Sequence, residues 1–220
     1  MEDALRYAIR PMRLADVPQA NEIDRECFPD QWPPPSYKTE LLFNRLADYL
    51  VAWEVDENPA EPIEKTEHSE ARPGHFLRRV RRFFSIKKAP HSATRQRIIG
   101  LVGFWIVAGE AHITTIGVRE AYRRQGIGEL LLISAIELAL MRHAQMTTLE
   151  VRASNSVAIA LYEKYGFTKT GVRRGYYTDN REDAVIMTTD TITSALFQSR
   201  LQRLKQAHAE RWGSTQCQID

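Results

Sequence analysis

One stretch constrains the fold more than any other: an apolar strand that passes through a basic turn with two glycines into a long apolar helix. The strand ends at Val118, the turn reads Arg123-Arg124-Gln125-Gly126-Ile127-Gly128, and the helix begins near Gly126. A helix N-terminus presents unpaired N–H groups and a partial positive charge, so it binds phosphate readily. Gly126 and Gly128 have no Cβ, which lets an anion approach the backbone closely. The stretch therefore predicts a phosphate-binding turn, and the plainer alternative is a basic turn that caps a core helix.

Two common nucleotide-binding loops do not fit this turn. No Lys-Ser or Lys-Thr follows a G-x-x-x-x-G, which excludes a Walker loop, and no third glycine completes a dinucleotide fingerprint. The turn instead resembles the acyl-CoA pyrophosphate loop, R/Q-x-x-G-x-G/A, of the GNAT superfamily of N-acyltransferases.

Composition limits the class of protein. At 220 residues with a formal net charge of +2, the chain suits one domain with additions and has no overall charge that would attract nucleic acid or a membrane. Cys27 and Cys217 lie far apart, match no metal-ligand spacing and are typical of reduced thiols. The sequence does not open with the apolar region of a secretory signal. The apolar helix after Gly126 is interrupted by Ser134 and Glu137, which excludes it as a transmembrane span. We therefore expect a soluble, cytoplasmic protein.

The remaining sequence alternates strands and helices. Strands are predicted over residues 7–13, 49–55, 98–107, 110–118, 147–152, 167–172 and 184–188, and helices over residues 16–27, 36–46, 126–143, 155–165 and 193–212. Asp16 and Ser36 are the expected caps, Gly109-Glu110 is the expected hairpin turn, and Arg173–Asn180 is an expected loop. The order β-α-α-β-β-β-α-β-α-β-β predicts an α+β fold, a mixed central sheet with helices on both faces, and it is also the order of the GNAT fold.

Residues 56–97 differ in character from the rest. The first part is acidic, and the second, from Arg72 to Arg97, holds nine cations and no acid. Prolines break the segment into short pieces, so we expect a flexible insertion in a loop. The basic part either contacts rRNA or an anionic surface, or is a solvated loop. The predicted organisation is a GNAT acetyltransferase domain over residues 1–190, interrupted by this insertion, and a C-terminal helical extension over residues 191–220.

A second segment carries a sharper resemblance. Residues 149–167 read Leu-Glu-Val-Arg-Ala-Ser-Asn-Ser-Val-Ala-Ile-Ala-Leu-Tyr-Glu-Lys-Tyr-Gly-Phe. Together with the turn and Arg174-Gly-Tyr-Tyr, this run closely resembles RimI-type ribosomal-protein-alanine N-acetyltransferases. The resemblance is strong over residues 98–190 and weak over residues 7–55. The family usually has an asparagine where Gly175 stands, a difference that affects acceptor recognition rather than acetyl transfer.

Spacing independently brings part of this segment together. Side chains alternate along a strand, so Glu150 faces away from its apolar neighbours. Asn155 and Tyr162 are seven residues apart, about two helical turns, and therefore share one face of a helix. Tyr162 carries a hydroxyl that a purely structural core position would not need.

The resemblance implies a role for each of these residues. Glu150 matches the proton acceptor for the attacking amine, Tyr162 the proton donor to the departing thiolate, and Asn155 an amide that contacts CoA. A phenol with a pKa near ~10 stays protonated at neutral pH, whereas a thiolate with a parent pKa near ~8.5 takes up a proton. Transfer is then direct, with acetyl-CoA as cosubstrate and no metal. The resemblance also implies a strand edge for pantetheine and a pyrophosphate cradle: Ile116, Gly117, Val118, Arg124, Gln125, Gly126, Ile127, Gly128 and Glu129.

Each residue also has a structural interpretation. Glu150 could be a solvated or salt-bridged carboxylate of the sheet, and Tyr162 could be a packing tyrosine. His112 is in phase with Thr114 and Ile116 on its strand, so it is either a hydrogen-bonded sheet histidine or a reserve base that titrates nearer neutrality.

The predicted function is transfer of acetyl from acetyl-CoA to the N-terminal α-amine of a protein, with a ribosomal protein that begins with alanine as the acceptor. The alternatives are acetylation of a small amine, such as a polyamine or an aminoglycoside, and a non-catalytic CoA-binding or ribosome-associated module. The Glu150–Asn155–Tyr162 set argues against the module. Two loops, Trp32–Tyr37 and Arg173–Asp179, argue against the small amine, because they are built from proline and aromatic residues instead of the acidic cluster that a polycation would attract. In the family the equivalent loops wall the acceptor peptide groove, and the plainer alternative is that both are ordinary loops.

Overall fold

The computed structural model describes residues 7–29, 36–55, 96–213 and 216–218. The strands are β1 (Tyr7–Pro11), β2 (Ala47–Glu54), β3 (Ile98–Val107), β4 (Glu110–Val118), β5 (Met146–Arg152), β6 (Phe167–Tyr177), β7 (Glu182–Thr189) and β8 (Gln216–Cys217). The helices are α1 (Val17–Cys27), α2 (Tyr37–Phe43), α3 (Ile127–Met141), α4 (Ser156–Lys164) and α5 (Ala195–Trp212), with 3-10 turns η1 (Leu14–Asp16) and η2 (Glu120–Tyr122). The predicted order of helices and strands is confirmed as far as α5, and β8 was not predicted.

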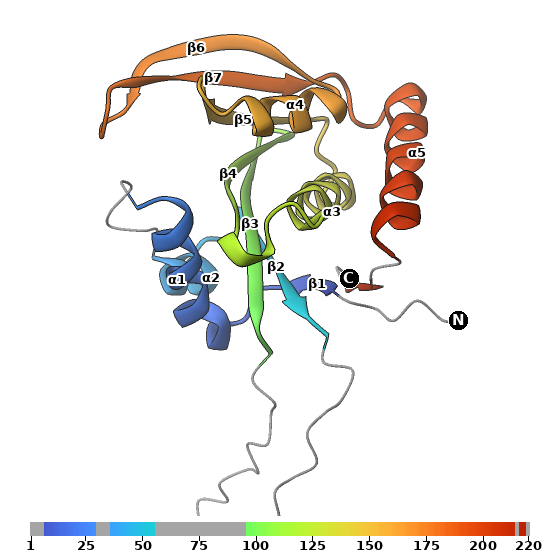
Figure 1. The fold of residues 1–220 in the computed structure, drawn as a ribbon. Coiled ribbons are helices and arrows are strands. Elements are labelled where there is room, and N and C mark those ends of the chain that lie inside the picture. Colours follow the sequence, from blue (N-terminus) through green and yellow to red (C-terminus); the bar gives the residue numbers. More distant parts are fainter. Residues whose placement is uncertain (1–6, 30–35, 56–95, 214–215, 219–220) are drawn as a thin grey trace, which may run out of the picture.

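The strands form one sheet of eight strands in the order β6-β7-β5-β4-β3-β2-β1-β8 (Figure 1). Pairing is parallel between β4 and β5 and between β1 and β8, and antiparallel elsewhere. The sheet is therefore mixed, as the sequence predicts. β6 lies at one edge, and the two-residue β8 covers β1 at the other.

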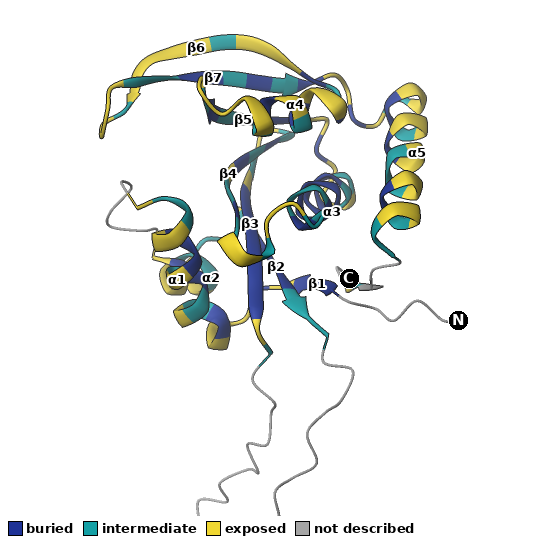
Figure 2. Cartoon of the chain, in the orientation of Figure 1, coloured by how far each residue is buried: buried dark blue, intermediate teal, exposed yellow. Residues whose placement is uncertain are grey.

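Helices cover both faces of the sheet, as predicted. Figure 1 shows α1 and α2 on one side of β2 and β3, and α3 with α5 on the other. The sequence of α3 is rich in Leu and Ala, which are strong helix formers, and 10 of its 15 residues are buried (Figure 2). The main hydrophobic core surrounds α3, and a smaller core that includes Ile23, Tyr37 and Val51 lies under α1 and α2. The middle strands of the sheet therefore lie between the two cores.

The predicted loop over Arg173–Asn180 is wrong over residues 173–177, because β6 continues through Tyr177, and it is confirmed over residues 178–180, which form the turn to β7. Its pairing with β7 shifts register between Arg173 and Tyr177, where Gly175 has a φ of 58° and donates its N–H to Asp183 Oδ1 at 2.8 Å. β6 is an edge strand that is exposed along most of its length. An exposed edge strand does not need the alternation of apolar and polar residues by which strands are predicted.

The predicted turn and helix caps need smaller corrections. The β3–β4 hairpin turns at Ala108-Gly109, one residue earlier than the predicted Gly109-Glu110, and both turn residues have a positive φ, as a type I′ turn requires. Asp16 and Ser36 precede α1 and α2 as predicted, but neither side chain caps its helix. Asp16 instead binds buried Arg10 through both carboxylate oxygens, at 2.7 and 3.0 Å.

Two predicted segments lie largely outside the described residues. Of the insertion over residues 56–97 only residues 96–97 are described, and of the loop over residues 32–37 only residues 36–37. The proposed domain boundaries and the nucleic-acid contact of Arg72–Arg97 therefore stay predictions. The strands beside the insertion are joined to each other, since Trp53 pairs with Ile98. No helix in the described ranges is both long enough and apolar enough to cross a membrane.

Candidate active site

Strands β4 and β5 run side by side for only part of their length. They pair in parallel from Glu110 with Met146 as far as Ile113 with Leu149. At Thr114, β4 has an extra residue in its pairing with β3, a β-bulge that redirects the strand. Beyond the bulge β4 has no strand partner on this side within the described residues, while β5 continues to pair with β7. The two strands therefore open a gap in the middle of the sheet.

Glu150 lines this gap from β5 and has two partners. Its Oε2 lies 2.5 Å from His112 Nε2, and its Oε1 lies 3.0 Å from Arg173 Nη2. The Glu150 side chain is 9% exposed and that of His112 is 35% exposed, so the pair connects the interior with solvent. Glu150 is thus a salt-bridged carboxylate, and the candidate base Glu150 is in direct contact with the reserve base His112.

A cavity of about 230 Å³ lies beside Glu150, and we call it the acceptor cavity after the role that the sequence predicts for Glu150. Asp24 of α1 contributes a second carboxylate; burial raises its pKa, although the hydrogen bond from Tyr37 at 2.8 Å acts in the opposite direction. Tyr177 of β6 forms part of the wall, with the Arg152 guanidinium 4.0 Å from its ring centroid, and burial raises the pKa of Tyr177 to about 12. The lining is Asp24, Cys27, Phe28, Ile113, Thr114, Thr115, Ile116, Leu149, Glu150, Val151, Arg152, Asn155, Tyr162 and Tyr177.

Helix α4 presents Asn155 and Tyr162 on one face, as their spacing predicts. Asn155 is the N-cap of α4, and its Oδ1 accepts the N–H of Ala158 at 3.1 Å. Tyr162 is 5% exposed, with its ring centroid 5.7 Å from that of Phe167. Burial, together with nearby Tyr177, raises the pKa of Tyr162 well above its usual value. The hydroxyl is therefore protonated at neutral pH, as a proton donor must be.

A larger cavity of about 800 Å³, which we call the groove, adjoins the acceptor cavity. The two share Ile116, Asn155 and Tyr162 and therefore meet between the free edge of β4 and α4. The N-terminus of α3 forms part of the groove: Gly126 is the N-cap with a φ of 78° and no side-chain capping bond. The N–H groups of residues 127–129 precede the first i→i−4 bond of the helix, so they are available to an anion.

The groove is basic near this helix end. Arg123, Arg124 and Arg211 all line it. Glu129 also lines it, but its carboxylate lies 2.5 Å from Lys164 Nζ. Burial alone would raise the pKa of Glu129, and the hydrogen bonds that it accepts, first that from Lys164, lower it below its usual range. Lys164 compensates this carboxylate, and Glu120 is the other acid among the lining residues. The three arginines outnumber it, so the groove keeps a net positive charge for a bound anion.

Most residues predicted from the sequence line these two cavities. Glu150 lines the acceptor cavity, and Ile116, Val118, Arg124, Gly126, Ile127, Gly128, Glu129, Asn155 and Tyr162 line the groove. Gly117 and Gln125 line neither. Gly117 faces Cys27 of α1, and the Gln125 side chain accepts from Tyr7 Oη at 2.5 Å.

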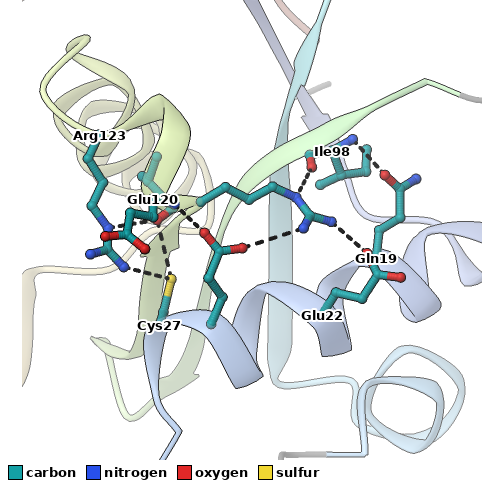
Figure 3. Close-up of polar contacts among 9 residues, drawn as sticks. Gln19, Glu22, Cys27, Ile98, Glu120 and Arg123 are labelled. Carbon is teal, nitrogen blue, oxygen red and sulfur yellow. Dashed lines mark hydrogen bonds and ion pairs between the residues drawn. The ribbon is translucent and has the colours of Figure 1, made fainter.

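Helix α1 is tied to the turn before α3. Arg119 binds Glu22 of α1 at 2.8 Å, and Cys27 Sγ and Arg123 Nε both donate to the Val118 carbonyl, at 3.3 and 3.2 Å (Figure 3). Burial raises the pKa of the Cys27 thiol, which keeps it in the protonated form that can donate. These bonds fix one wall of the acceptor cavity relative to the turn that lines the groove.

Sequence reasoning missed several lining residues. Asp24, Cys27 and Phe28 reach the acceptor cavity from α1, and Arg211 and Trp212 reach the groove from the end of α5. Each lies far along the chain from the two motifs, in a segment whose local pattern indicates only an amphipathic helix. Tyr177 belongs to Arg173–Asp179, which was expected beside the acceptor.

Known proteins share both the sequence and the fold. A model of the family described as "Acetyltransferase (GNAT) family" matches residues 17–167. A Bacillus subtilis protein provisionally named ribosomal protein bS18-alanine N-acetyltransferase is 37% identical over 182 residues, which cover 83% of this chain and 94% of that protein. An N-alpha-acetyltransferase of Sulfurisphaera tokodaii is 33% identical over 183 residues, 82% of this chain and 91% of that one. The crystal structure of the Escherichia coli ribosomal-protein-S18-alanine N-acetyltransferase has a TM-score of 0.59 and 26% identity, and covers 86% of this chain and 96% of that one.

These matches confirm the predicted resemblance, the α+β acyltransferase fold and the N-acetyltransferase class that the resemblance implied. The roles of individual residues stay predictions. So does the expectation that transfer needs no metal; among the described residues, no group of three or more His, Cys, Asp or Glu is placed to hold one. The family match ends at residue 167, so α5 lies beyond it.

Proposed function

The chain belongs to the acetyltransferase (GNAT) family, and on that basis we propose that it acetylates the N-terminal α-amine of a protein, with a ribosomal protein that begins with alanine as the acceptor. Acetyl-CoA is the acyl donor of this family. The names of the B. subtilis and E. coli relatives specify the alanine of ribosomal protein S18 for those proteins, and that acceptor is the one proposed here.

One observation carries the proposal: the groove and the acceptor cavity meet at Ile116, Asn155 and Tyr162, next to Glu150. A donor held in the groove and an amine held in the acceptor cavity would come together at this junction. Holding the two reactants in contact removes most of the entropic cost of a bimolecular reaction. The junction also has a carboxylate on the acceptor side and a protonated phenol on α4.

Glu150 would accept the proton of the attacking amine. The amine nitrogen bonds to the thioester carbonyl carbon, and the N–H proton moves to a carboxylate oxygen of Glu150, directly or through a water. His112 Nε2 lies 2.5 Å from that carboxylate and its side chain is partly exposed, so it would pass the proton to solvent. Arg173 holds the other oxygen at 3.0 Å and orients the carboxylate.

Tyr162 would complete the transfer as the acid. The C–S bond breaks and the sulfur takes the phenolic proton, and the tyrosine regains a proton from solvent after the thiol leaves. Burial keeps the hydroxyl protonated until the thiolate forms. A thiolate with a parent pKa near ~8.5 is a stronger base than the acetylated amide product, so the proton is needed at sulfur.

The donor would be held by backbone and side-chain groups of the groove. The pantetheine arm pairs with the free edge of β4 over residues 116–118, like an added strand. The pyrophosphate takes the N–H groups of residues 127–129 and the charge of Arg124. The Asn155 amide contacts the arm near the junction. A metal has no required part in these steps.

The ionisation of the acceptor favours an α-amine over a lysine. An α-amino group has a pKa near ~7.7–8.0, so roughly a tenth to a fifth of it is neutral at pH 7. A lysine amine with a pKa near ~10.4 is less than about a thousandth neutral and needs far more help from a base. A single carboxylate such as Glu150 suits the easier deprotonation. Asp24, in the same cavity, would attract the ammonium form before it loses its proton.

The test compares acceptors under one set of conditions. The full chain is incubated with acetyl-CoA and a short peptide with a free N-terminal alanine, the same peptide blocked at its N-terminus but with an internal lysine, or spermidine. We expect mass spectrometry to show one acetyl group on the α-amine of the first peptide and little product from the others. Preferential turnover of spermidine would favour the small-amine alternative, and CoA binding without turnover of any amine would favour the non-catalytic module.

A further inference from the structure

Helix α5 reaches the groove with its last turn. Arg211 and Trp212 line the groove together with Arg123, Arg124 and Gly126. A Cβ built on Gly126 would lie 2.6 Å from Trp212 Cδ1 and 2.7 Å from its Nε1. The indole therefore packs against the α-carbon of Gly126, in the turn over residues 123–128 that we call the phosphate turn after its predicted role. The Arg211 guanidinium lies 4.9 Å from the centroid of the indole ring, within the range of a cation–π contact.

Contacts on both sides of Trp212 fix this last turn. Before it, Leu201 is buried in the main core and His208 Nε2 donates to the Gly126 carbonyl at 3.0 Å. After it, β8 pairs with β1, and Cys217 Sγ lies 3.3 Å from the buried Ser134 hydroxyl of α3. These protein contacts hold the last turn of α5 against the groove.

The direction of the donor decides which part of it meets this wall. If the proposed function holds, the thioester lies at Tyr162, where the groove meets the acceptor cavity, and the pyrophosphate lies at the N–H groups of residues 127–129. Arg211 and Trp212 lie beside the phosphate turn and do not line the acceptor cavity. The part of CoA on the far side of the pyrophosphate from the thioester is the adenosine 3′-phosphate.

We propose that Arg211 and Trp212 bind the nucleotide end of acetyl-CoA, Arg211 through the 3′-phosphate and Trp212 through the face of the adenine. This assignment rests on the proposed function. A guanidinium offers planar, paired donors that match phosphate oxygens, and an indole offers a flat face for a base. The helix that lies beyond the family match thus supplies a wall of the cofactor site.

The phosphate contact is tested by calorimetry on the full chain with CoA and with 3′-dephospho-CoA. We expect the wild-type protein to prefer CoA by about tenfold or more, the value of a charged hydrogen bond. Arg211→Gln is expected to bind both ligands equally, with its affinity for 3′-dephospho-CoA unchanged. Arg203→Gln is the matched control, because Arg203 is an exposed arginine of α5 outside the groove, and it should keep the wild-type preference.

The adenine contact is tested with 4′-phosphopantetheine, which lacks the adenosine. Trp212→Ala is expected to weaken CoA and 3′-dephospho-CoA equally, by about tenfold, and to leave 4′-phosphopantetheine unchanged. Trp212→Phe keeps an aromatic face and should retain most of the affinity. Circular dichroism and thermal unfolding establish that each variant is folded.

Each outcome has a definite meaning. The phosphate assignment is overturned if Arg211→Gln keeps the wild-type preference, or if it weakens both ligands equally, which would put Arg211 at the pyrophosphate. An equal loss of 4′-phosphopantetheine in Trp212→Ala would show that the indole only supports the turn, and it would overturn the adenine contact. Wild-type protein that binds no CoA would overturn the proposed function itself, whereas wild-type binding matched by both variants would overturn only this inference.

Discussion

The acceptor cavity and the groove meet at Tyr162, yet their electrostatic character is opposite. The acceptor cavity contains the carboxylates of Asp24 and Glu150, which suit an amine, and its one lining arginine, Arg152, is paired with two acids outside the cavity. The groove contains arginines and free helix N–H groups, which suit a polyanion. Glu150 already has protein partners, while the N–H groups of residues 127–129 do not have intrahelical ones. Under the proposed function, proton transfer belongs to the smaller cavity and binding of the donor to the larger. Variants of the first should change kcat, and variants of the second should change the affinity for CoA.

Tyr162→Phe should have the largest effect of all. It removes the acid but keeps the ring against Phe167, so we expect kcat to fall by about 10²–10⁴-fold while the Kd for CoA hardly changes. Because the pKa of Tyr162 is raised, the wild-type hydroxyl stays protonated from about pH 6 to about pH 9, and the loss should be similar throughout. Initial rates of thiol release over this range, with calorimetry for CoA, provide the measurement. Weaker CoA binding at an unchanged kcat would instead assign the hydroxyl to the groove.

Glu150→Gln should have the next largest effect, and its dependence on pH should differ. We expect a loss of about 10²-fold near neutral pH. The loss should shrink as the pH rises through about 7.7–8.0, because the acceptor amine then loses its proton without a base. The same assay, run with an N-terminal alanine peptide, measures both the rate and this convergence.

His112→Gln is the companion variant for the Glu150–His112 pair. It leaves the carboxylate in place and removes only the route from Glu150 to solvent, so we expect a smaller loss, about tenfold. If Glu150→Gln instead keeps the wild-type rate and pH profile while His112→Gln does not, His112 is the base and Glu150 orients it.

The sequence was informative where a site is contiguous in the chain. The phosphate turn, the free edge of β4 and the face of α4 each lie within one short segment, so Glu150, Asn155 and Tyr162 could be predicted from spacing and resemblance. Asp24 and Trp212 could not, because packing of α1 and α5 brings them to the site. That packing depends on the order of the strands in the sheet, and no local sequence pattern predicts this order.

The edge of the sheet shows the same limit in another form. The sequence predicts a loop over Arg173–Asn180, but residues 173–177 form the end of β6 and pair with β7. Arg173 binds Glu150 from this part of the strand. An exposed edge strand can be polar on both faces, so its periodicity does not distinguish it from a loop. The partner of the catalytic candidate was therefore hidden in a segment without a strand pattern.

Gly128→Glu tests the groove and should act on affinity. We expect a carboxylate beside the helix N–H groups to weaken CoA binding by about 10- to 100-fold, with little change in kcat at saturating donor. A Cβ at Gly128 would meet only Val118 Cγ2, at 3.7 Å, so Gly128→Ala is a matched control for bulk. Gly126→Glu is a poorer probe, because Gly126 has a φ of 78° and contacts Trp212. If calorimetry gives the same Kd for Gly128→Glu and Gly128→Ala, the pyrophosphate does not lie at this turn.

Removal of residues 57–95 should have the smallest effect on either cavity. In the part of the chain that the structure describes, the two cavities are lined by residues within the ranges 24–28, 113–129 and 149–162 and by residues 177, 211 and 212. Trp53 already pairs with Ile98, so a short Asn-Gly turn can join β2 to β3. Gln96 has to remain, because its Oε1 accepts from Arg10 Nε at 2.9 Å and its carbonyl accepts from Gln19 Nε2 at 3.0 Å.

We expect the shortened protein to match the full chain within about twofold in both kcat and the Kd for CoA, since shortening a surface connection changes little beyond its closure entropy. Peptide acetylation and calorimetry measured side by side on the two proteins make this comparison. A folded variant that binds CoA normally but no longer turns over the peptide would show that the segment belongs to the acceptor side. One that loses CoA binding would assign the segment to the groove, and the division between the two cavities would then have to include residues 57–95.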